Sequence, residues 1–262
     1  MRTDLPSFAS HNVKDGYTKL KFDLQWIAEF SGSFWNWPVS GIITASTFKK
    51  IFAIQEHLNL TKDVNGCVCE FGTHILSKLK VIRNLLAIYP PPRAKGKQLF
   101  GFDHFKGYLK SAAPQSEKFF YNNSSVFEVK NSSEVWESLD RFNTATKKIY
   151  SDSDEISLIE GRLPKSYIRR QTEIGPISLC YFDLQDVSVM SKLVPKVLIN
   201  CSEEAILIFE GYGLEFFPKV KLFVDRFIQE TESIQVIDCE TSIPFTKVVQ
   251  VRGSKKSPSS NG

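Results

Sequence analysis

Carboxylates and glycines stand together where the apolar runs of this sequence end. Five such ends read Glu70-Phe71-Gly72-Thr73, Gly101-Phe102-Asp103-His104, Glu160-Gly161-Arg162, Asp183-Leu184-Gln185-Asp186 and Glu210-Gly211-Tyr212-Gly213. A glycine lets a ligand approach the backbone closely, and a carboxylate after the second strand of a nucleotide-binding fold accepts hydrogen bonds from both ribose hydroxyls. Aspartate and glycine are also ordinary turn formers, so any single end carries little information. Together, the ends favour a nucleoside-binding site with Asp103 as the ribose ligand.

Strand and helix patterns alternate along the chain and would position these ends. Apolar runs typical of strands cover residues 66–72, 97–103, 155–163, 175–183 and 204–213, and a hairpin pattern covers 233–251. Patterns typical of helices cover 46–60, 75–89, 132–149, 187–197 and 218–231, with a short helix over 165–170. We expect the helix over 187–197 to end at its proline, Pro195. The order predicts a Rossmann-like, doubly wound α/β fold with a mainly parallel sheet and an antiparallel edge hairpin. Ligands of such sheets bind beyond the carboxyl ends of the strands, where the polar residues gather.

The alternation predicts three regions. Residues 1–60 are expected to form an N-terminal helical and aromatic cap segment, and residues 252–262 a disordered tail. Residues 61–251 are expected to form the Rossmann-like domain, with a lid-like insertion near 107–130. Exposed aromatic residues of the first region would suit either core packing or an interface, so a homo-oligomer stays open.

Composition narrows the class of protein. The chain has 262 residues, of which 42% are hydrophobic and 24% charged, which are ordinary globular values. Its net charge of +4 comes without a basic stripe, which argues against a nucleic-acid partner. The apolar runs are too short to span a membrane, and the start has no apolar segment of a secretory signal. Five cysteines without zinc-site spacing are typical of reduced thiols, so we expect a cytoplasmic protein.

Five stretches together resemble one known family. They are VCEFGT, QLFGFDHFKGY, ISLIEGRL, SLCYFDLQD and AILIFEGYGLEFFPKVKLFVDRF, in this order over about residues 50–250. The chain thereby resembles the macrocin O-methyltransferase (TylF-like) family of class I, S-adenosylmethionine-dependent and usually magnesium-dependent sugar O-methyltransferases. The resemblance implies a class I methyltransferase fold. It also implies methyl transfer to a hydroxyl of a sugar or another small polar natural-product or polysaccharide acceptor.

The resemblance also implies which residues bind S-adenosylmethionine. They are Glu70, Gly72 and Thr73 at the methionine end, with Ser77 in the same loop, Asp103 and His104 at the adenosine, and Gly161 and Arg162 near the adenine. The family's first loop usually continues with another glycine, where this chain has Leu76 or Ser77.

On the reaction side, the resemblance makes Asp183 face the metal and the acceptor hydroxyl. The family's fourth strand ends with a second carboxylate that serves as general base, but the corresponding residue here is Gln185. A glutamine accepts no proton at neutral pH. Asp186 would supply a carboxylate if the loop were shifted by one residue, so the catalytic candidates are Asp183, Gln185 and Asp186. His104 and His74 are further candidates for the base.

The metal site departs from the family in a similar way. Two aspartates usually end the fifth strand and bind the metal, and here they are Glu210 and Gly211. Glycine offers a hard cation no side-chain oxygen. Asp183 and Glu210 stay as candidate ligands of a Mg²⁺ ion, with water in its other positions.

Two functions of different classes therefore stay open. The first is an active S-adenosylmethionine-dependent O-methyltransferase with a weakened or metal-free mechanism. The second is a catalytically impaired methyltransferase-like binding or partner protein. A dehydrogenase is a weaker reading because no G-x-G-x-x-G follows the first strand, and RNA methylation is weaker still for want of a basic face.

Overall fold

The computed structural model describes residues 45–73, 77–88, 97–104, 136–137, 139–140, 143–144, 156–214, 217–241, 243 and 245–252. The lid-like insertion predicted near 107–130 and most of the predicted tail lie outside these residues, as does most of the N-terminal segment. Within the predicted helix over 132–149, the described residues are helical.

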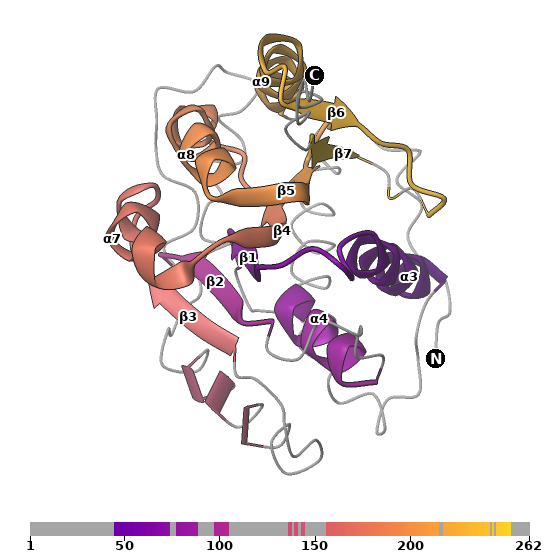
Figure 1. The fold of residues 1–262 in the computed structure, drawn as a ribbon, viewed down its shortest axis with the longest axis vertical. Helices are drawn as coiled ribbons and strands as arrows, with labels where there is room; N and C mark the ends of the chain where they lie inside the picture. The colour runs from indigo at the N-terminus through magenta and orange to yellow at the C-terminus, as the bar shows by residue number, and fades with distance from the viewer. Residues whose placement is uncertain are drawn as a thin grey trace, which may run out of the picture. The chain divides into compact units, whose positions relative to one another are not determined.

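A seven-stranded sheet lies at the centre of the fold, with the strand order β3-β2-β1-β4-β5-β7-β6 (Figure 1). The strands are β1 (Cys67–Phe71), β2 (Leu99–Asp103), β3 (Ile156–Glu160), β4 (Ile177–Phe182), β5 (Cys201–Glu210), β6 (Ile234–Val236) and β7 (Thr246–Val251). All the neighbouring strands from β3 to β5 are parallel, and β7 runs antiparallel to both β5 and β6. The predicted fold class, including the antiparallel pair at one edge, is confirmed.

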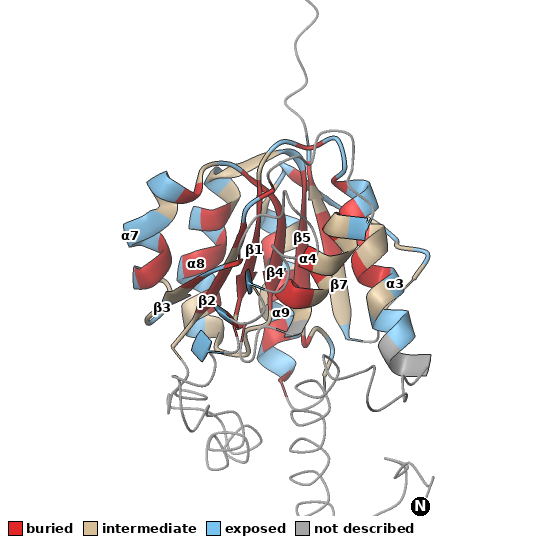
Figure 2. Ribbon diagram, turned by 90° about the horizontal axis from the view of Figure 1, so that it is seen from below, coloured by how far each residue is buried: buried red, intermediate tan, exposed pale blue. Residues whose placement is uncertain are grey.

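Helices cover both faces of this sheet, so that its central strands are buried between them (Figure 2). They are α3 (Ala45–Leu60), α4 (Ser77–Ile88), α7 (Lys165–Ile174), α8 (Val187–Ile199) and α9 (Pro218–Glu230). On the α3 and α4 face, Ile54, Leu58, Leu79 and Ile82 pack with buried side chains of the sheet. The helix α3, which we assigned to the N-terminal segment, belongs to the same compact unit as the sheet.

The opposite face of the sheet carries a row of stacked aromatic rings. Phe102, Phe71, Phe182 and Phe209 come from β2, β1, β4 and β5, the order in which those strands lie side by side. Their neighbouring ring centroids are 4.8, 5.4 and 5.0 Å apart, and all four rings are fully buried. Each of these phenylalanines is the last or second-last residue of its strand. The stacked rings therefore keep the polar residues at the four strand ends side by side.

The helix α8 corrects one sequence prediction. It runs through Pro195 to Ile199 rather than ending at the proline. Proline removes the hydrogen bond to the carbonyl four residues earlier, that of Ser191. Both residues lie on the exposed side of the helix. Water can therefore replace the lost donor, while the buried apolar side of the helix continues to pack on the sheet.

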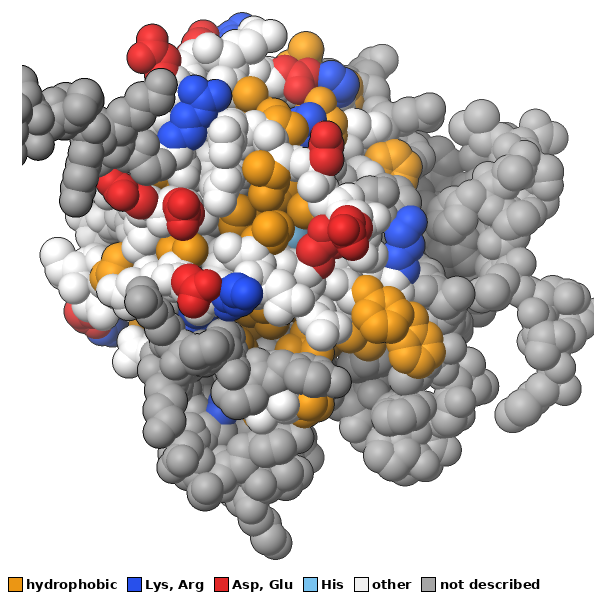
Figure 3. All heavy atoms as spheres, turned by 45° about the vertical axis from the view of Figure 1, so that its right-hand side comes forward, with side chains coloured by type: hydrophobic (Ala, Val, Ile, Leu, Met, Phe, Trp, Pro, Cys, Tyr) orange, Lys and Arg blue, Asp and Glu red, His pale blue; other side chains and the backbone are white. Residues whose placement is uncertain are grey.

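None of the helices among the described residues has the length and the apolar character that crossing a lipid bilayer requires. On the face drawn in Figure 3, Lys and Arg side chains lie singly among Asp and Glu side chains and small hydrophobic groups.

Candidate functional site

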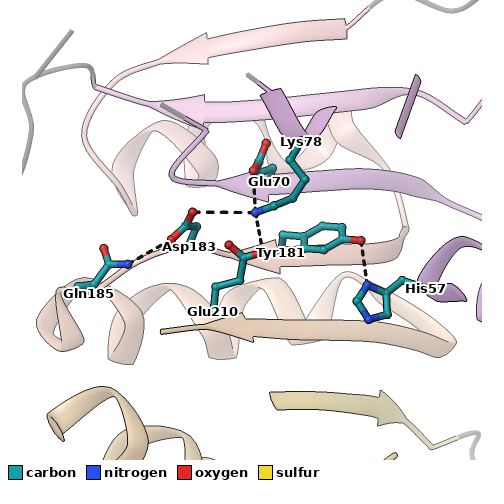
Figure 4. Close-up of polar contacts among 7 residues, drawn as sticks. All are labelled: His57, Glu70, Lys78, Tyr181, Asp183, Gln185 and Glu210. Atoms are coloured by element: carbon teal, nitrogen blue, oxygen red, sulfur yellow. Dashed lines mark hydrogen bonds and ion pairs between the residues drawn. The ribbon is translucent and has the colours of Figure 1, made fainter. Parts of the chain in front are cut away.

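The carboxyl ends of the parallel strands meet at one edge of the sheet. Phe71 pairs with Phe102 on one side and with Phe182 on the other, and Phe182 pairs in turn with Phe209. Because side chains alternate along a strand, the residues next to these phenylalanines point to the opposite face. Glu70, Asp183 and Glu210 therefore project on the α4 side of the sheet, where Figure 4 shows them around one lysine.

That lysine is Lys78, the second residue of α4. Its Nζ lies 2.7 Å from Glu210 Oε1, 3.0 Å from Glu70 Oε1 and 3.9 Å from Asp183 Oδ2. It also lies 5.0 Å from the ring centroid of Tyr181. We call Lys78 with these three carboxylates the Lys78 cluster. It reaches from the interior to the surface, because the side chain of Glu70 is 3% exposed and that of Asp183 is 41% exposed.

Burial and mutual repulsion shift the pKa values of the cluster. Burial raises the pKa of Glu70 to about 8, although the nearby ammonium of Lys78 opposes the shift. Burial likewise raises the pKa of Glu210 to about 7, again against Lys78 and with help from Asp183. For Lys78 itself burial acts to lower the pKa, but the carboxylates outweigh it and hold the pKa well above its usual value. Lys78 therefore stays positively charged, whereas Glu70 and Glu210 gain or lose protons near neutral pH.

Behind the cluster, Tyr181 is held from α3. Its hydroxyl lies 3.1 Å from His57 Nδ1, and both side chains are buried (Figure 4). Burial lowers the pKa of His57 to about 4, so its imidazole is neutral at pH 7 and adds no second positive charge. The pair fixes the ring of Tyr181 beneath the ammonium of Lys78.

Gly72, the glycine of the first loop, is required by packing. Its φ is +90°, and a Cβ there would lie 2.3 Å from the carbonyl oxygen of Asp183. The Gly72 N–H donates to the Phe102 carbonyl at 2.9 Å, and the Asp183 N–H donates to the Phe71 carbonyl at 2.9 Å. The loop after β1 is thus held against both neighbouring strands, and no larger residue fits at this position.

Two buried polar atoms beside this loop are available to a ligand. Among the described residues, Glu70 Oε2 and Thr73 Oγ1 have no hydrogen-bond partner. Buried polar atoms are nearly always paired in native proteins, so these two atoms at the end of a strand are candidates for hydrogen bonds to a ligand. The neighbouring positions His74 and Leu76, and the side chain of Ser77, lie outside the described residues.

The ends of β2 and β3 form a second polar group beside β1. The His104 N–H donates to Asp103 Oδ1 at 2.6 Å, and the Gly161 N–H donates to the Asp103 carbonyl at 2.8 Å. Arg162 follows on the exposed side. The predicted adenosine-binding residues therefore lie on adjacent strands, next to the loop that carries Gly72.

At the end of β4, Gln185 and Asp186 have distinct structural roles. Gln185 Nε2 donates to Asp183 Oδ1 at 3.1 Å, and it lies 3.8 Å from where a Cβ on Gly211 would stand. The two departures from the family pattern are thus neighbours in space. Asp186 caps α8, because its Oδ1 accepts from the Ser188 N–H and hydroxyl at 2.8 and 2.6 Å. This capping role does not favour Asp186 as the general base.

The residues present do not fit a resident Mg²⁺ ion. The predicted ligands Asp183 and Glu210 face the ammonium of Lys78, and Gly211 adds no side-chain oxygen. Within the described residues, no group of three or more His, Cys, Asp or Glu side chains is arranged to hold a metal.

Lys78 was not predicted as a site residue, although the sequence carries a signal for it. Lys78, Val81, Ile82 and Leu85 follow the spacing of one helical face, and the last three pack on or in the core. A lysine in the apolar stripe of a helix needs a buried anionic partner. One of its partners, Glu70, is close in sequence, but Glu210 lies far along the chain.

Comparison with solved structures places the fold. No protein-family model matches the chain, and no curated protein matches it in sequence. The crystal structure of CalS11, a calicheamicin methyltransferase, superposes with a TM-score of 0.67 at 15% identity, over 95% of this chain and 98% of that one. An apo structure of CalS11, described as a TDP-rhamnose 3'-O-methyltransferase of calicheamicin biosynthesis, gives 0.59 at 15% identity, over 92% and 96%. The O-methyltransferase NovP gives 0.58 at 13% identity, over 78% of this chain and 80% of that one. With its strand order and its antiparallel β7, the chain therefore has the Rossmann-like fold of the class I methyltransferases.

Proposed function

We propose that the chain is an S-adenosylmethionine-dependent O-methyltransferase that methylates a hydroxyl of a sugar or a similar small polar acceptor. The observation that carries the proposal is the polar edge of β1, where Glu70 Oε2 and Thr73 Oγ1 are buried and unpaired among the described residues. Support for the acceptor class comes from CalS11 and NovP, whose folds the chain shares and which are named as O-methyltransferases.

The cofactor would lie along the ends of β1, β2 and β3. Glu70 and Thr73 have polar atoms to bind the methionine end, and Gly72 brings the backbone close to it. Asp103 is the last residue of β2, where a carboxylate can accept hydrogen bonds from both ribose hydroxyls, and His104 is next to it. Gly161 and Arg162 would border the adenine. When bound, S-adenosylmethionine supplies an electrophilic methyl group on a sulfonium sulfur.

The acceptor would meet the cluster at Asp183. Asp183 is the most exposed carboxylate of the three, and Gln185 holds its Oδ1 by a hydrogen bond. S-adenosylmethionine would supply the methyl group to the acceptor oxygen and would leave as S-adenosylhomocysteine. The hydroxyl proton passes to Asp183. Gln185 orients this carboxylate, and it takes no proton itself.

Titration calorimetry with S-adenosylhomocysteine tests the cofactor site. The full chain is expected to bind one equivalent, and Asp103→Ala is expected to weaken binding by roughly tenfold or more, since it removes a charge-assisted hydrogen-bond acceptor. Glu173→Ala is the matched control, because it removes an exposed carboxylate of α7 that lies outside the polar strand ends. An absence of binding to the folded wild-type chain would contradict the proposal.

Turnover is tested by mass spectrometry of nucleotide sugars, TDP-rhamnose among them, after incubation with S-adenosylmethionine. One added methyl group on an acceptor is the expected product. Asp183→Asn keeps the shape of the side chain but removes the base, so it should reduce kcat by about 10²- to 10⁴-fold and leave S-adenosylhomocysteine affinity unchanged. Unaltered turnover by this variant would exclude Asp183 as the base.

A further inference from the structure

We propose that Lys78 is a built-in cation that stands in place of a divalent metal ion, so that the site is assembled and works without Mg²⁺. The use of this cation in methyl transfer rests on the proposed function, whereas its exclusion of metal does not.

The first support is the position of the ammonium. It lies between carboxylates from β1, β4 and β5, at 3.0 Å from Glu70, 3.9 Å from Asp183 and 2.7 Å from Glu210. No single strand supplies more than one of the three. A cation that gathers carboxylates from several strand ends does what a bound metal would do at the same edge of the sheet. Here the cation is part of the chain.

The second support is the charge of the cluster. Glu70 is almost completely buried, and the side chain of Glu210 is only 21% exposed. Carboxylates so far from water can ionise only beside a positive partner. Lys78 is the cation that the structure places among them, and its own side chain is 16% exposed. Removal of its charge would leave these carboxylates without their cation, which a divalent ion could then replace.

The third support is that the surroundings oppose a metal ion. Mg²⁺ requires near-octahedral oxygen ligands at about 2.0–2.1 Å. An ion at that distance from Glu210 and Asp183 would lie against the ammonium of Lys78 and be repelled by it. Gln185 also directs an N–H, not an oxygen, at Asp183 Oδ1. Gln185 and Gly211, two of the departures from the family pattern, thus remove oxygen ligands at the same place where Lys78 supplies a positive charge.

The fourth support is that Lys78 is held from behind. The helix α4 begins at Ser77 and packs through Leu79 and Ile82, which are fully buried. The ring of Tyr181 lies under the ammonium, and His57 fixes the tyrosine hydroxyl. The side chain is therefore placed by packing as well as by its ion pairs. The charge is preorganised, as a transition-state stabilising group must be.

In methyl transfer, Lys78 would remain protonated and act by its charge. The acceptor hydroxyl develops negative charge as it loses its proton to Asp183, and the ammonium beside Asp183 stabilises that charge. Lys78 thus acts through its charge and by positioning Asp183, and Asp183 remains the base.

Mn²⁺ titration of the full chain, followed by electron paramagnetic resonance, tests the exclusion of metal without any need for turnover. We compare the wild type with Lys78→Met, which keeps the length of the side chain and removes its charge. The control is Lys192→Met, at an exposed lysine of α8. The wild type and Lys192→Met should bind Mn²⁺ equally weakly, whereas Lys78→Met should bind it roughly tenfold more tightly or better.

Several results would overturn the inference. One is a wild-type chain that binds one Mn²⁺, releases it to Mg²⁺, and loses it in Asp183→Asn. Another is a folded Lys78→Met variant whose Mn²⁺ affinity equals that of the wild type. If Lys78→Met does not fold, the wild-type titration alone decides, with Lys78→Arg as a charge-retaining variant that should also stay metal-free.

A parallel measurement separates this inference from the proposed function. The affinity of the wild type for S-adenosylhomocysteine should be the same within about twofold in EDTA and in Mg²⁺, since no metal contributes to the site. An increase of tenfold in Mg²⁺ would refute the built-in cation. A complete absence of S-adenosylhomocysteine binding would instead refute the proposed function and leave the Mn²⁺ result to stand.

Discussion

Gly72 follows β1 directly, and Lys78 lies in the first turn of α4. Both constrain the carboxyl ends of the strands, but through different interactions. Gly72 is defined by space, because its Cβ position is filled by the Asp183 carbonyl. Lys78 is defined by charge, because carboxylates from three strands surround it. Gly72 therefore constrains the end of β4 by steric contact, and Lys78 constrains the end of β5 by charge.

The steric constraint predicts a large cost for a single methyl group. Gly72→Ala should lower the free energy of unfolding by about 2–4 kcal/mol, from a strained φ and a backbone clash together. Gly213→Ala is the matched control, since Gly213 has a similar φ of +78° with nothing within 4 Å. It should cost only about 1–2 kcal/mol. Urea unfolding of both variants measures the difference, and equal costs would show that the contact with Asp183 is unimportant.

The electrostatic constraint predicts a stability that falls with pH between 6.5 and 8. Glu70 and Glu210 have native pKa values of about 8 and 7, above their ordinary value of 4.5, so the native state holds more protons than the unfolded state in this range. Stability is then lost as pH rises. His57, lowered from 6.5 to about 4, acts in the opposite direction only below pH 6.5, and Lys97, lowered to about 8, only above pH 8.

Glu70→Gln should flatten this pH dependence, because it removes one of the protons taken up on folding. The measurement is the free energy of urea unfolding at several pH values from 6.5 to 8. Glu173→Gln, at an exposed glutamate paired with Arg170, should leave the slope as in the wild type. A slope that Glu70→Gln does not change would mean that Glu70 is ionised throughout.

The hydrogen bonds of Asp186 at the start of α8 assign its carboxylate the role of a helix cap. Asp186 Oδ1 accepts from the backbone N–H groups of Ser188 and Val189 at 2.8 and 3.3 Å. Such an N-cap contributes about 1 kcal/mol, and serine replaces aspartate in this role at little cost.

Asp186→Ser should therefore keep both the stability and the turnover of the wild type, whereas Asp186→Ala should lose about 1 kcal/mol of stability. Thermal unfolding and the rate of methyl transfer measure the two effects. A large loss of kcat in the stable Asp186→Ser variant would restore Asp186 as the general base.

The sequence predicts local elements well and distant contacts poorly. The strand over 175–183 and the helix over 218–231 follow from uninterrupted apolar and amphipathic patterns, and both are present as β4 and α9. The end of α8 was predicted at Pro195, because a proline rule ignores which side of the helix faces water. The contact of Lys78 with the predicted site carboxylates was missed, since Asp183 and Glu210 approach it only after β1, β4 and β5 have paired.

For the domain as a whole, bound ligand should appear as added stability. A ligand at 100 times its Kd adds about 2.7 kcal/mol to the native state. Saturating S-adenosylhomocysteine should therefore raise Tm by roughly 5–10 °C for a domain of this size. Scanning calorimetry measures the shift, and Asp103→Ala at the same ligand concentration should show little of it. An unchanged wild-type Tm would argue against a preformed cofactor site.

The central position of β1 in the sheet determines when the Lys78 cluster can form during synthesis of the chain. β1 is the first of the seven strands along the chain, yet it lies between β2 and β4, and β5 pairs with β4 and β7. The Lys78 cluster includes Glu210, the last residue of β5, so it is incomplete on a nascent chain until that strand has emerged and docked. Long-range parallel pairing of this kind is slow. The ion pair between Lys78 and Glu210 can therefore form only after β5 has been synthesised and has paired with β4.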